Sequence, residues 1–377
     1  MEFDLSWILL GLPIAFVAGW LASRLDLRQL RIENRQAPKA YFKGLNFLLN
    51  EQQDQAIDAF IEAVQNDPDT TELHFALGNL FRRRGEYERA VRVHEHLLSR
   101  ADLVPGDRHR AQHALALDFL KAGLLDRAEA ALRKLENTPF EGEAGLALLA
   151  IYERTRDWPK AAEIAQKLEA NGQGHFGVRR AHYLCEQASQ AEPAAAAALL
   201  LEAMALTRDT ARPGIELAQL QQRSGALEDA YETLRQTALT VPAALPLIAK
   251  PLTEVAQAAG RQADAVALLR ASYEQSPALD VMQALAALDT AASTPRDWYL
   301  RHLEREPSLV AAAQWIAGEK LEHEQFHPQV QRALDHAVKP LTRYRCAACG
   351  FEAKQHFWQC PGCQSWDSYP ARRVEEL

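Results

Sequence analysis

The chain has few cysteines, no excess of positive charge and no motif typical of a catalytic loop. Five of its 377 residues are cysteine, and 50 acidic residues outnumber 42 Lys and Arg, giving a formal charge of −8. A basic footprint is therefore missing overall, so nucleic acid is not an expected partner. The sequence also has no Gly-rich phosphate loop and no GxSxG elbow. Strand patterns are scarce and helix formers recur throughout, which predicts an all-α chain.

An apolar run near the N-terminus predicts a membrane anchor. Residues 5–22 read LSWILLGLPIAFVAGWLA and carry no charge. A helix of that length spans roughly 27 Å, enough for a thin bilayer core. Acidic Glu2 and Asp4 precede the run and arginines follow it. The positive-inside rule then places the N-terminus in the periplasm and the bulk of the chain in the cytoplasm. A cleaved signal peptide is the alternative, but such peptides normally begin with positive charge.

Two stripes of residues accompany the predicted anchor, which we assign to residues 1–23. Small residues spaced by four could let a second membrane helix approach, although a simple anchor explains them equally well. They are Gly11, Ala15 and Gly19. Arginines in the following segment, 24–40, could contact anionic headgroups, although control of topology alone would explain them. They are Arg24, Arg28, Arg31 and Arg35.

Residues 41–340 show an internal period. Gly44 recurs as Gly78 and Ala56 as Ala90, both 34 residues later. This period and these landmarks resemble the tetratricopeptide repeat, in which small residues let paired helices touch and larger ones such as Phe60 fill the gaps. The small residue of the second helix recurs at Ala128, Ala161, Ala196, Ala230 and Ala265, and turn glycines precede it at Gly85, Gly123, Gly225 and Gly260. We expect a solenoid whose first helices line a groove for a partner, with one or two degenerate units after residue 280. A generic helical solenoid or bundle is the alternative.

Four of the cysteines form the most specific motif. Two CxxC pairs, separated by ten residues, can bring four thiolates around one metal ion. They are Cys346, Cys349, Cys360 and Cys363. Four protein ligands leave no open coordination position, so the metal is predicted to be structural. Zinc is favoured over iron, although four thiolates suit both. Two disulfides are the rival interpretation, which a reducing cytoplasm disfavours.

The predicted module, residues 341–377, is too small to fold without its metal. Gly350 and Gly362 are expected to supply the permissive backbone of the two metal-binding turns. The aromatic residues are expected both to fill a small core and to dock on the last helices. They are Tyr344, Phe351, Trp358 and Trp366.

Two further patterns suggest catalysis only weakly. His323 to His327 match HExxH, but Pro328 follows at once and no third ligand is evident. Cys185 stands alone on a predicted helix and is expected to be a buried apolar residue. No catalytic residue is therefore predicted, and the chain is not expected to be an enzyme.

The order of anchor, arginine-rich segment, repeat array and rubredoxin-type four-cysteine module resembles the lipopolysaccharide assembly protein B family over essentially the whole chain. The resemblance implies a single-pass protein of the inner membrane that acts as an adaptor. It would present the LpxC deacetylase to the FtsH membrane protease and be restrained by a lipopolysaccharide-sensing membrane regulator. A scaffold that organises lipopolysaccharide synthesis and transport without proteolysis is the alternative.

Overall fold

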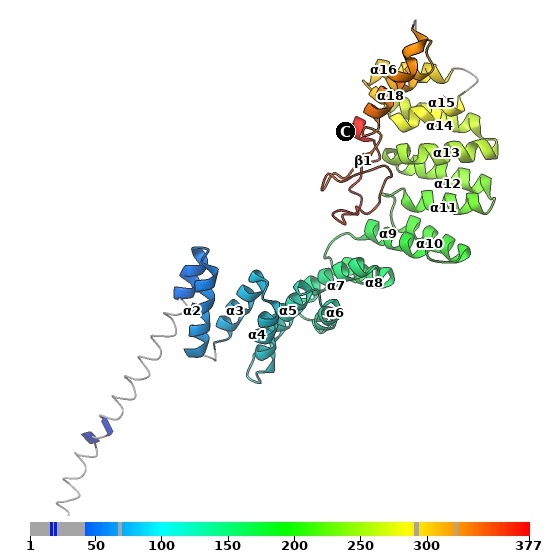
Figure 1. Cartoon of the computed structure of the whole chain (residues 1–377). Coiled ribbons are helices and arrows are strands. Elements are labelled where there is room, and N and C mark those ends of the chain that lie inside the picture. Colours follow the sequence, from blue (N-terminus) through cyan, green and yellow to red (C-terminus); the bar gives the residue numbers. More distant parts are fainter. Residues whose placement is uncertain (1–15, 18, 21–41, 67–69, 290–293, 321–322) are drawn as a thin grey trace, which may run out of the picture. The chain divides into compact units, whose positions relative to one another are not determined.

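The computed structural model describes residues 16, 17, 19, 20, 42–66, 70–289, 294–320 and 323–377 (Figure 1). Most of the predicted anchor lies outside these residues, including Gly11 and Ala15, and so do all four predicted interfacial arginines of the next segment. Gly19 is described as helical, and a Cβ added there would meet nothing within 4 Å. No single helix among the described residues is both long and apolar enough to cross a bilayer. Leu227–Thr240 and Pro242–Ala259 pass that test only as a pair, and the pair is bent by 117°.

The described chain is mostly helical and divides into two compact units, Met1–Ile151 and Tyr152–Leu377. In the first unit residues 42–49 are helical, followed by α2 (Gln53–Asn66), α3 (Thr71–Arg84), α4 (Tyr87–Ser99), α5 (Pro105–Lys121) and α6 (Leu125–Arg133). Helix α7 (Glu141–Thr155) crosses the boundary. The second unit continues with α8 (Trp158–Ala170), α9 (Gly177–Ala188), α10 (Pro193–Leu206), α11 (Arg212–Arg223), α12 (Leu227–Thr240), η1 (Pro242–Ala244), α13 (Leu245–Ala259), α14 (Gln262–Gln275), α15 (Leu279–Leu288), α16 (Pro295–Arg305), α17 (Leu309–Ala317), η2 (Glu324–Phe326) and α18 (His327–Val338).

The predicted tetratricopeptide pattern matches how these helices pack. A Cβ on Gly44 would lie 3.0 Å from the Phe60 ring, so only glycine allows this close approach. One period later Gly78 faces His94 in the same way, which places a histidine where the first repeat has phenylalanine. The small residue predicted for each second helix is buried in every repeat: Ala56, Ala90, Ala128, Ala161, Ala196, Ala230 and Ala265.

The predicted turn glycines end the first helix of their repeats. Gly85 and Gly260 cap α3 and α13 with φ of +84° and +72°, and Gly123 and Gly225 have φ of +77° and +82°. These angles are in the left-handed region, where a side chain would be strained. After α14, helices α15 to α18 form two further pairs, α15 with α16 and α17 with α18. The second unit has one large apolar core, which runs from α11 to α18.

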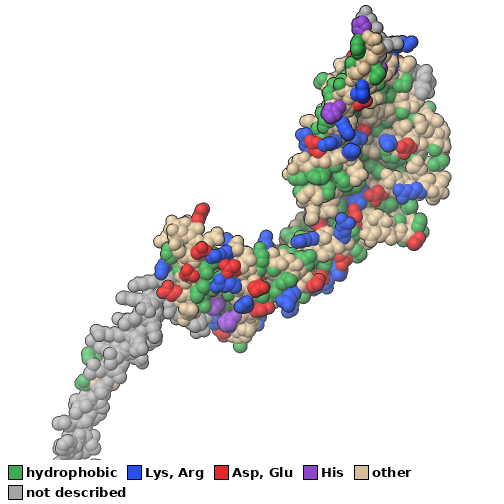
Figure 2. All heavy atoms as spheres, viewed as in Figure 1, with side chains coloured by type: hydrophobic (Ala, Val, Ile, Leu, Met, Phe, Trp, Pro, Cys, Tyr) green, Lys and Arg blue, Asp and Glu red, His purple; other side chains and the backbone are tan. Residues whose placement is uncertain are grey.

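The C-terminal module follows α18 and contains little regular structure. Strands β1 (Tyr344–Arg345) and β2 (Glu352–Ala353) pair antiparallel, and η3 (Val374–Glu376) ends the chain. Within the second unit the module lies beside the stacked helices (Figure 1). On the face seen in Figure 2, basic and acidic side chains are interspersed on each unit, as expected for solvated helix surfaces.

Candidate metal centre

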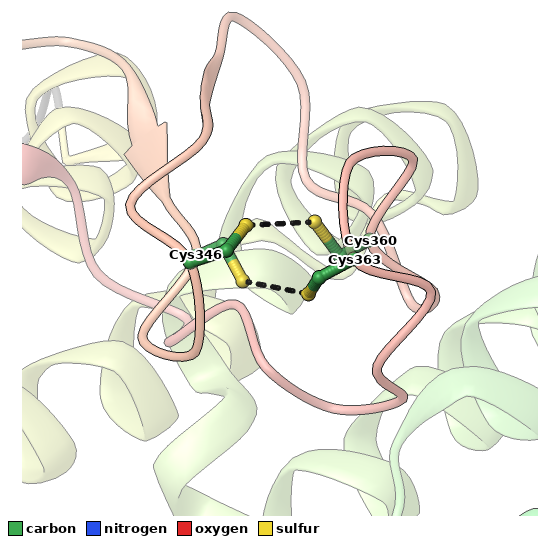
Figure 3. A group of neighbouring side chains, drawn as sticks. Cys346, Cys360 and Cys363 are labelled. Carbon is green, nitrogen blue, oxygen red and sulfur yellow. Dashed lines mark hydrogen bonds between the residues drawn. The ribbon is translucent and has the colours of Figure 1, made fainter. Parts of the chain in front are cut away.

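The structure brings the four predicted cysteines together in the module. Their sulfur atoms all lie within 4.8 Å of one another. Cys346 and Cys363 sulfurs are 3.8 Å apart, and those of Cys349 and Cys360 are 3.7 Å apart. Figure 3 shows Cys346 on one loop facing Cys360 and Cys363 on another, with a dashed line for each of the two sulfur–sulfur contacts. Among the described residues this is the one group of three or more Cys, His, Asp or Glu side chains placed to share a metal ion.

The two CxxC segments form matching turns, here called knuckle 1 (residues 346–351) and knuckle 2 (residues 360–365). In knuckle 1 the amide of Gly350 donates to the carbonyl of Cys346 at 2.9 Å, and the Cys346 amide donates to Phe351 at 2.9 Å. In knuckle 2 the Gln364 amide donates to the Cys360 carbonyl at 2.8 Å, and the Cys360 amide donates to the Ser365 carbonyl at 2.9 Å. This repeated geometry places one buried and one exposed cysteine on each side of the centre.

The predicted role of one glycine is wrong. Gly350 has the expected left-handed backbone, with φ of +77°, but Gly362 does not have a positive φ. The equivalent residue of knuckle 2 is Gln364, with φ of +61°. The turn needs the left-handed conformation directly after its second cysteine, whereas Gly362 lies between the two cysteines. A Cβ on Gly362 would make ordinary contact with Phe351 at 3.5 Å.

The surroundings of Cys346 and Cys363 favour negative charge, whereas hydrogen bonding to the neighbouring cysteines contributes to a raised pKa of Cys349. Burial opposes ionisation of Cys346, but hydrogen bonds with the Ser368 hydroxyl and with knuckle amides outweigh it and lower its pKa to about 6. Hydrogen bonds from the side chain and backbone of Ser365 lower the pKa of Cys363. Such bonds stabilise thiolates, the form that binds metal.

These residues fit a metal ion better than they fit two disulfides. All four cysteines are free. A tetrahedral site with metal–sulfur bonds of about 2.3 Å has sulfur–sulfur edges of about 3.8 Å, and the two pairs measured here are 3.7 and 3.8 Å apart. A disulfide would need about 2.05 Å. Four sulfur ligands would also complete the coordination of the ion.

Trp366 fixes knuckle 2 to the repeats of the second unit. Its indole N–H donates to Glu153 at 3.0 Å, and the same carboxylate oxygen accepts from the Tyr183 hydroxyl at 2.5 Å and from Arg179 at 2.7 Å. Burial and the bond to Glu153 raise the pKa of Tyr183, so its hydroxyl stays protonated and can donate. Trp158 meets the Trp366 ring edge-on, with centroids 6.0 Å apart.

His182 contributes a second contact to this docking. Its ring is fully buried and stacks on Trp366 at 4.8 Å between centroids. Its Nε2 lies 2.8 Å from a carboxylate oxygen of Asp367. Trp366 therefore packs on α8 and α9 rather than on the last helices, whereas Trp358 packs against the apolar core that runs from α11 to α18, in agreement with the prediction. Of the other predicted aromatics, Tyr344 is buried in the module, whereas Phe351 is 45% exposed.

The end of the chain fastens the module to later helices. Glu375 accepts from the Leu309 amide at 2.5 Å, from the Val310 amide at 3.0 Å and from the Ser308 hydroxyl at 2.7 Å, at the start of α17. Glu376 accepts from the Leu279 amide at 2.9 Å, at the start of α15. Both carboxylates thus satisfy amides that a helix leaves unpaired, where the helix dipole also favours negative charge.

One further ion pair completes this attachment. Arg373 donates two hydrogen bonds to Asp280, both 2.8 Å long, and its guanidinium lies 4.1 Å above the Tyr344 ring. The module therefore contacts the second unit at α7, α8, α9, α13, α15 and α17. Glu153, His182 and Asp280 on these helices are therefore engaged by the chain's own module.

The structure does not form a zinc-protease site from the HExxH match at residues 323–327. His323 lies in a turn, whereas His327 begins α18 and its Nε2 is 3.2 Å from the Ile316 carbonyl, so the two histidines do not share a helix. Cys185 is fully buried on α9, as predicted, and burial raises its pKa. Sequence reasoning missed Glu153, His182 and the terminal glutamates, because no local pattern links residues so far apart in the chain.

The fold and the site together define a tetratricopeptide-repeat protein with a C-terminal four-cysteine module. A family model described as "Rubredoxin metal binding domain" matches residues 344–369, and one described as "Tetratricopeptide repeat" matches residues 73–108. Lipopolysaccharide assembly protein B of Escherichia coli strain K12 is 31% identical, over 99% of this chain and 100% of that protein. The protein of the same name from Haemophilus influenzae is 29% identical, over 96% of both chains. The chain belongs to the lipopolysaccharide assembly protein B family.

Among solved structures, a tetratricopeptide repeat protein from Parabacteroides merdae is 15% identical. The match covers 68% of this chain and 100% of that one, with a TM-score of 0.35. This likeness is distant, and nothing about function follows from it.

Proposed function

We propose that the protein is a non-enzymatic adaptor of the inner membrane that regulates lipopolysaccharide synthesis by presenting the LpxC deacetylase to the FtsH protease. The observation that carries the proposal is the full-length match to proteins named for lipopolysaccharide assembly. A helical repeat array offers extended binding surface without catalytic groups, which suits an adaptor.

The remaining parts of the chain have roles in this proposal. The apolar run at residues 5–22 anchors the protein with its N-terminus in the periplasm, and the arginines that follow it meet the cytoplasmic headgroups. The stripe of Gly11, Ala15 and Gly19 offers a surface for the protease or for a lipopolysaccharide-sensing regulator in the membrane. The four cysteines hold one structural ion, zinc in preference to iron.

The lifetime of LpxC tests this function. Cells depleted of the protein are treated to stop protein synthesis, and LpxC is followed over time. The proposal predicts a longer lifetime, restored by the intact protein but not by a version that lacks residues 1–22. An unchanged lifetime would contradict the proteolytic adaptor and favour the scaffold that organises synthesis and transport proteins without degradation.

A further inference from the structure

The first unit contains an open groove between the starts of α4 and α6, with a volume of about 820 Å³. Its floor is partly apolar, with Phe119 and Leu124, and three arginines line it: Arg89, Arg92 and Arg127. The groove therefore combines apolar surface with three cations on the surface of the first unit.

Two of these arginines are held in the same way by equivalent positions of successive repeats. Arg89 directly precedes the small residue Ala90, and Arg127 directly precedes Ala128. The Arg89 guanidinium lies 4.0 Å from the centre of the Phe81 ring, and that of Arg127 lies 5.7 Å from the centre of Phe119. Stacking on a ring orders a guanidinium while leaving its N–H groups at the edge free to bind a carboxylate.

The acidic residues on the rim do not fully neutralise these cations. Glu86 is shared, at 2.6 Å from Arg89 and 2.9 Å from Arg84, so one carboxylate serves two guanidiniums. Glu88 lies 3.7 Å from Arg92 with both side chains largely exposed, an arrangement that contributes little. Arg127 forms no ion pair within the described part of the chain.

The second unit offers an internal comparison. The groove between α12 and α14 has a volume of about 380 Å³ and is lined by Glu228, Glu232 and Asp264 together with two arginines. At the positions where the first unit has Arg89 and Arg127, directly before the small alanine, the two repeats that form this second groove have Asp229 and Asp264, while the repeat of α8 has Lys160. The repeat framework is thus shared, and the positive charge belongs to the groove of the first unit.

We propose that the groove between α4 and α6 binds an acidic peptide segment of a partner protein, with Arg89 and Arg127 gripping its carboxylates from opposite walls. The apolar floor would take the intervening side chains. The view that the partner is a protein rests on the proposed adaptor function.

The test is fluorescence anisotropy with the full-length protein in detergent and a fluorescein-labelled peptide, Glu-Leu-Glu-Glu-Leu-Glu. The same peptide with glutamine in place of glutamate is the neutral control. The double variant Arg89→Gln and Arg127→Gln is expected to bind the acidic peptide about tenfold more weakly, as the loss of two charge-assisted contacts implies. Arg127→Lys keeps the positive charge but loses the planar guanidinium. Its affinity for the acidic peptide should lie between those of the wild type and the double variant.

The matched control is the double variant Arg235→Gln and Arg261→Gln, which removes the same charge at the α12–α14 groove. It is expected to keep the wild-type affinity within about twofold, since distant exposed charges are screened by salt. An equal loss in both double variants would overturn the proposal, as would equal binding of the neutral peptide or stronger binding of an oligothymidylate of the same charge. A change in LpxC lifetime is not needed for either result, so failure of this inference and failure of the proposed function remain distinguishable.

Discussion

Trp366 donates its indole N–H to Glu153, a residue 213 positions earlier in the chain, at a distance of 3.0 Å. This bond joins the loop that carries two of the four cysteines to a helix of the repeat array. The Glu153 carboxylate is mostly buried, with 14% of its side chain exposed. A hydrogen bond to a buried charge is worth more than one at the surface, so this contact should contribute measurably to stability.

Replacing Trp366 with Phe is expected to lower the free energy of unfolding by about 1–2 kcal/mol, because the ring contacts remain while the bond to Glu153 is lost. Urea unfolding of the metal-loaded protein measures the change. Trp315→Phe is the control, since Trp315 stacks on Arg296 away from the module. Equal effects of the two substitutions would contradict a special role for the bond.

Removal of the metal should free the module while leaving the repeats folded. We expect one metal ion per chain, and treatment with a chelator under reducing conditions should make residues 341–377 sensitive to protease, with little loss of helical circular dichroism. Cys346→Ser should weaken metal binding by more than about 100-fold, because it removes a ligand itself. Loss of a residue that only hydrogen-bonds to a ligand typically costs about 10- to 100-fold. Cys185→Ala, which alters a buried cysteine on α9, should leave the metal content unchanged. Full metal content in Cys346→Ser would refute the site.

The backbone of the knuckles predicts an order of effects for three substitutions. Gly350→Ala should cost about 1–2 kcal/mol, because its φ of +77° is in the left-handed region. Gln364→Gly relieves the same strain at φ of +61° and should be neutral or stabilise the module by up to about 1 kcal/mol. Gly362→Ala should change stability by less than about 0.5 kcal/mol. Urea unfolding measures the change in stability of each variant, and competition with a chelator measures its affinity for metal. A larger loss of stability in Gly362→Ala than in Gly350→Ala would contradict the predicted order.

A buried histidine predicts how stability depends on pH. His302 is 2% exposed and its Nδ1 lies 2.8 Å from the Tyr273 hydroxyl. Burial lowers the pKa of His302 and raises the pKa of Tyr273 to about 12, so the phenol keeps its proton and forms a hydrogen bond with the neutral ring. The unfolded chain binds a proton on this histidine more readily than the folded protein does. The contribution of His302 is therefore complete above its ordinary pKa of 6.5 and is lost as the pH falls below that value.

Urea unfolding between pH 7.5 and pH 5, on the order of one unit either side of the ordinary histidine pKa, tests this dependence. His302→Gln should flatten the fall in stability toward low pH, although it lowers stability at neutral pH. His336→Gln, at an exposed position on α18, should leave the slope as it is in the wild type. An unchanged slope in His302→Gln would assign the pH dependence to other groups.

The sequence predicted those features that repeat or that follow from a fixed spacing. The 34-residue period located the small residues that let helices touch, because each repeat packs its two helices together at equivalent positions. The two CxxC pairs located the four cysteines that meet, because a metal ion demands that chemistry. Gln364 escaped prediction because a glutamine gives no sign that its backbone will be left-handed.

The docking of the module could not be read from local patterns. Glu375 and Glu376 look like ordinary solvated charges at the end of a chain, and only the structure places them at the starts of α17 and α15. His94 likewise gives no local sign of being buried. It fills the space that Phe60 fills in the preceding repeat, and it lies 2.5 Å from Asp118, a residue of α5.

The contacts made by Glu375 and Glu376 have a consequence for biosynthesis. The ribosome completes α15 and α17 before it adds the residues that pair with their first amides. A chain that terminates early would possess every repeat yet lack the carboxylates that finish two of its helices and fasten its cysteine module. The second unit can therefore reach its final state only after Glu375 and Glu376 have been added, so these contacts form after all of the repeats have been synthesised.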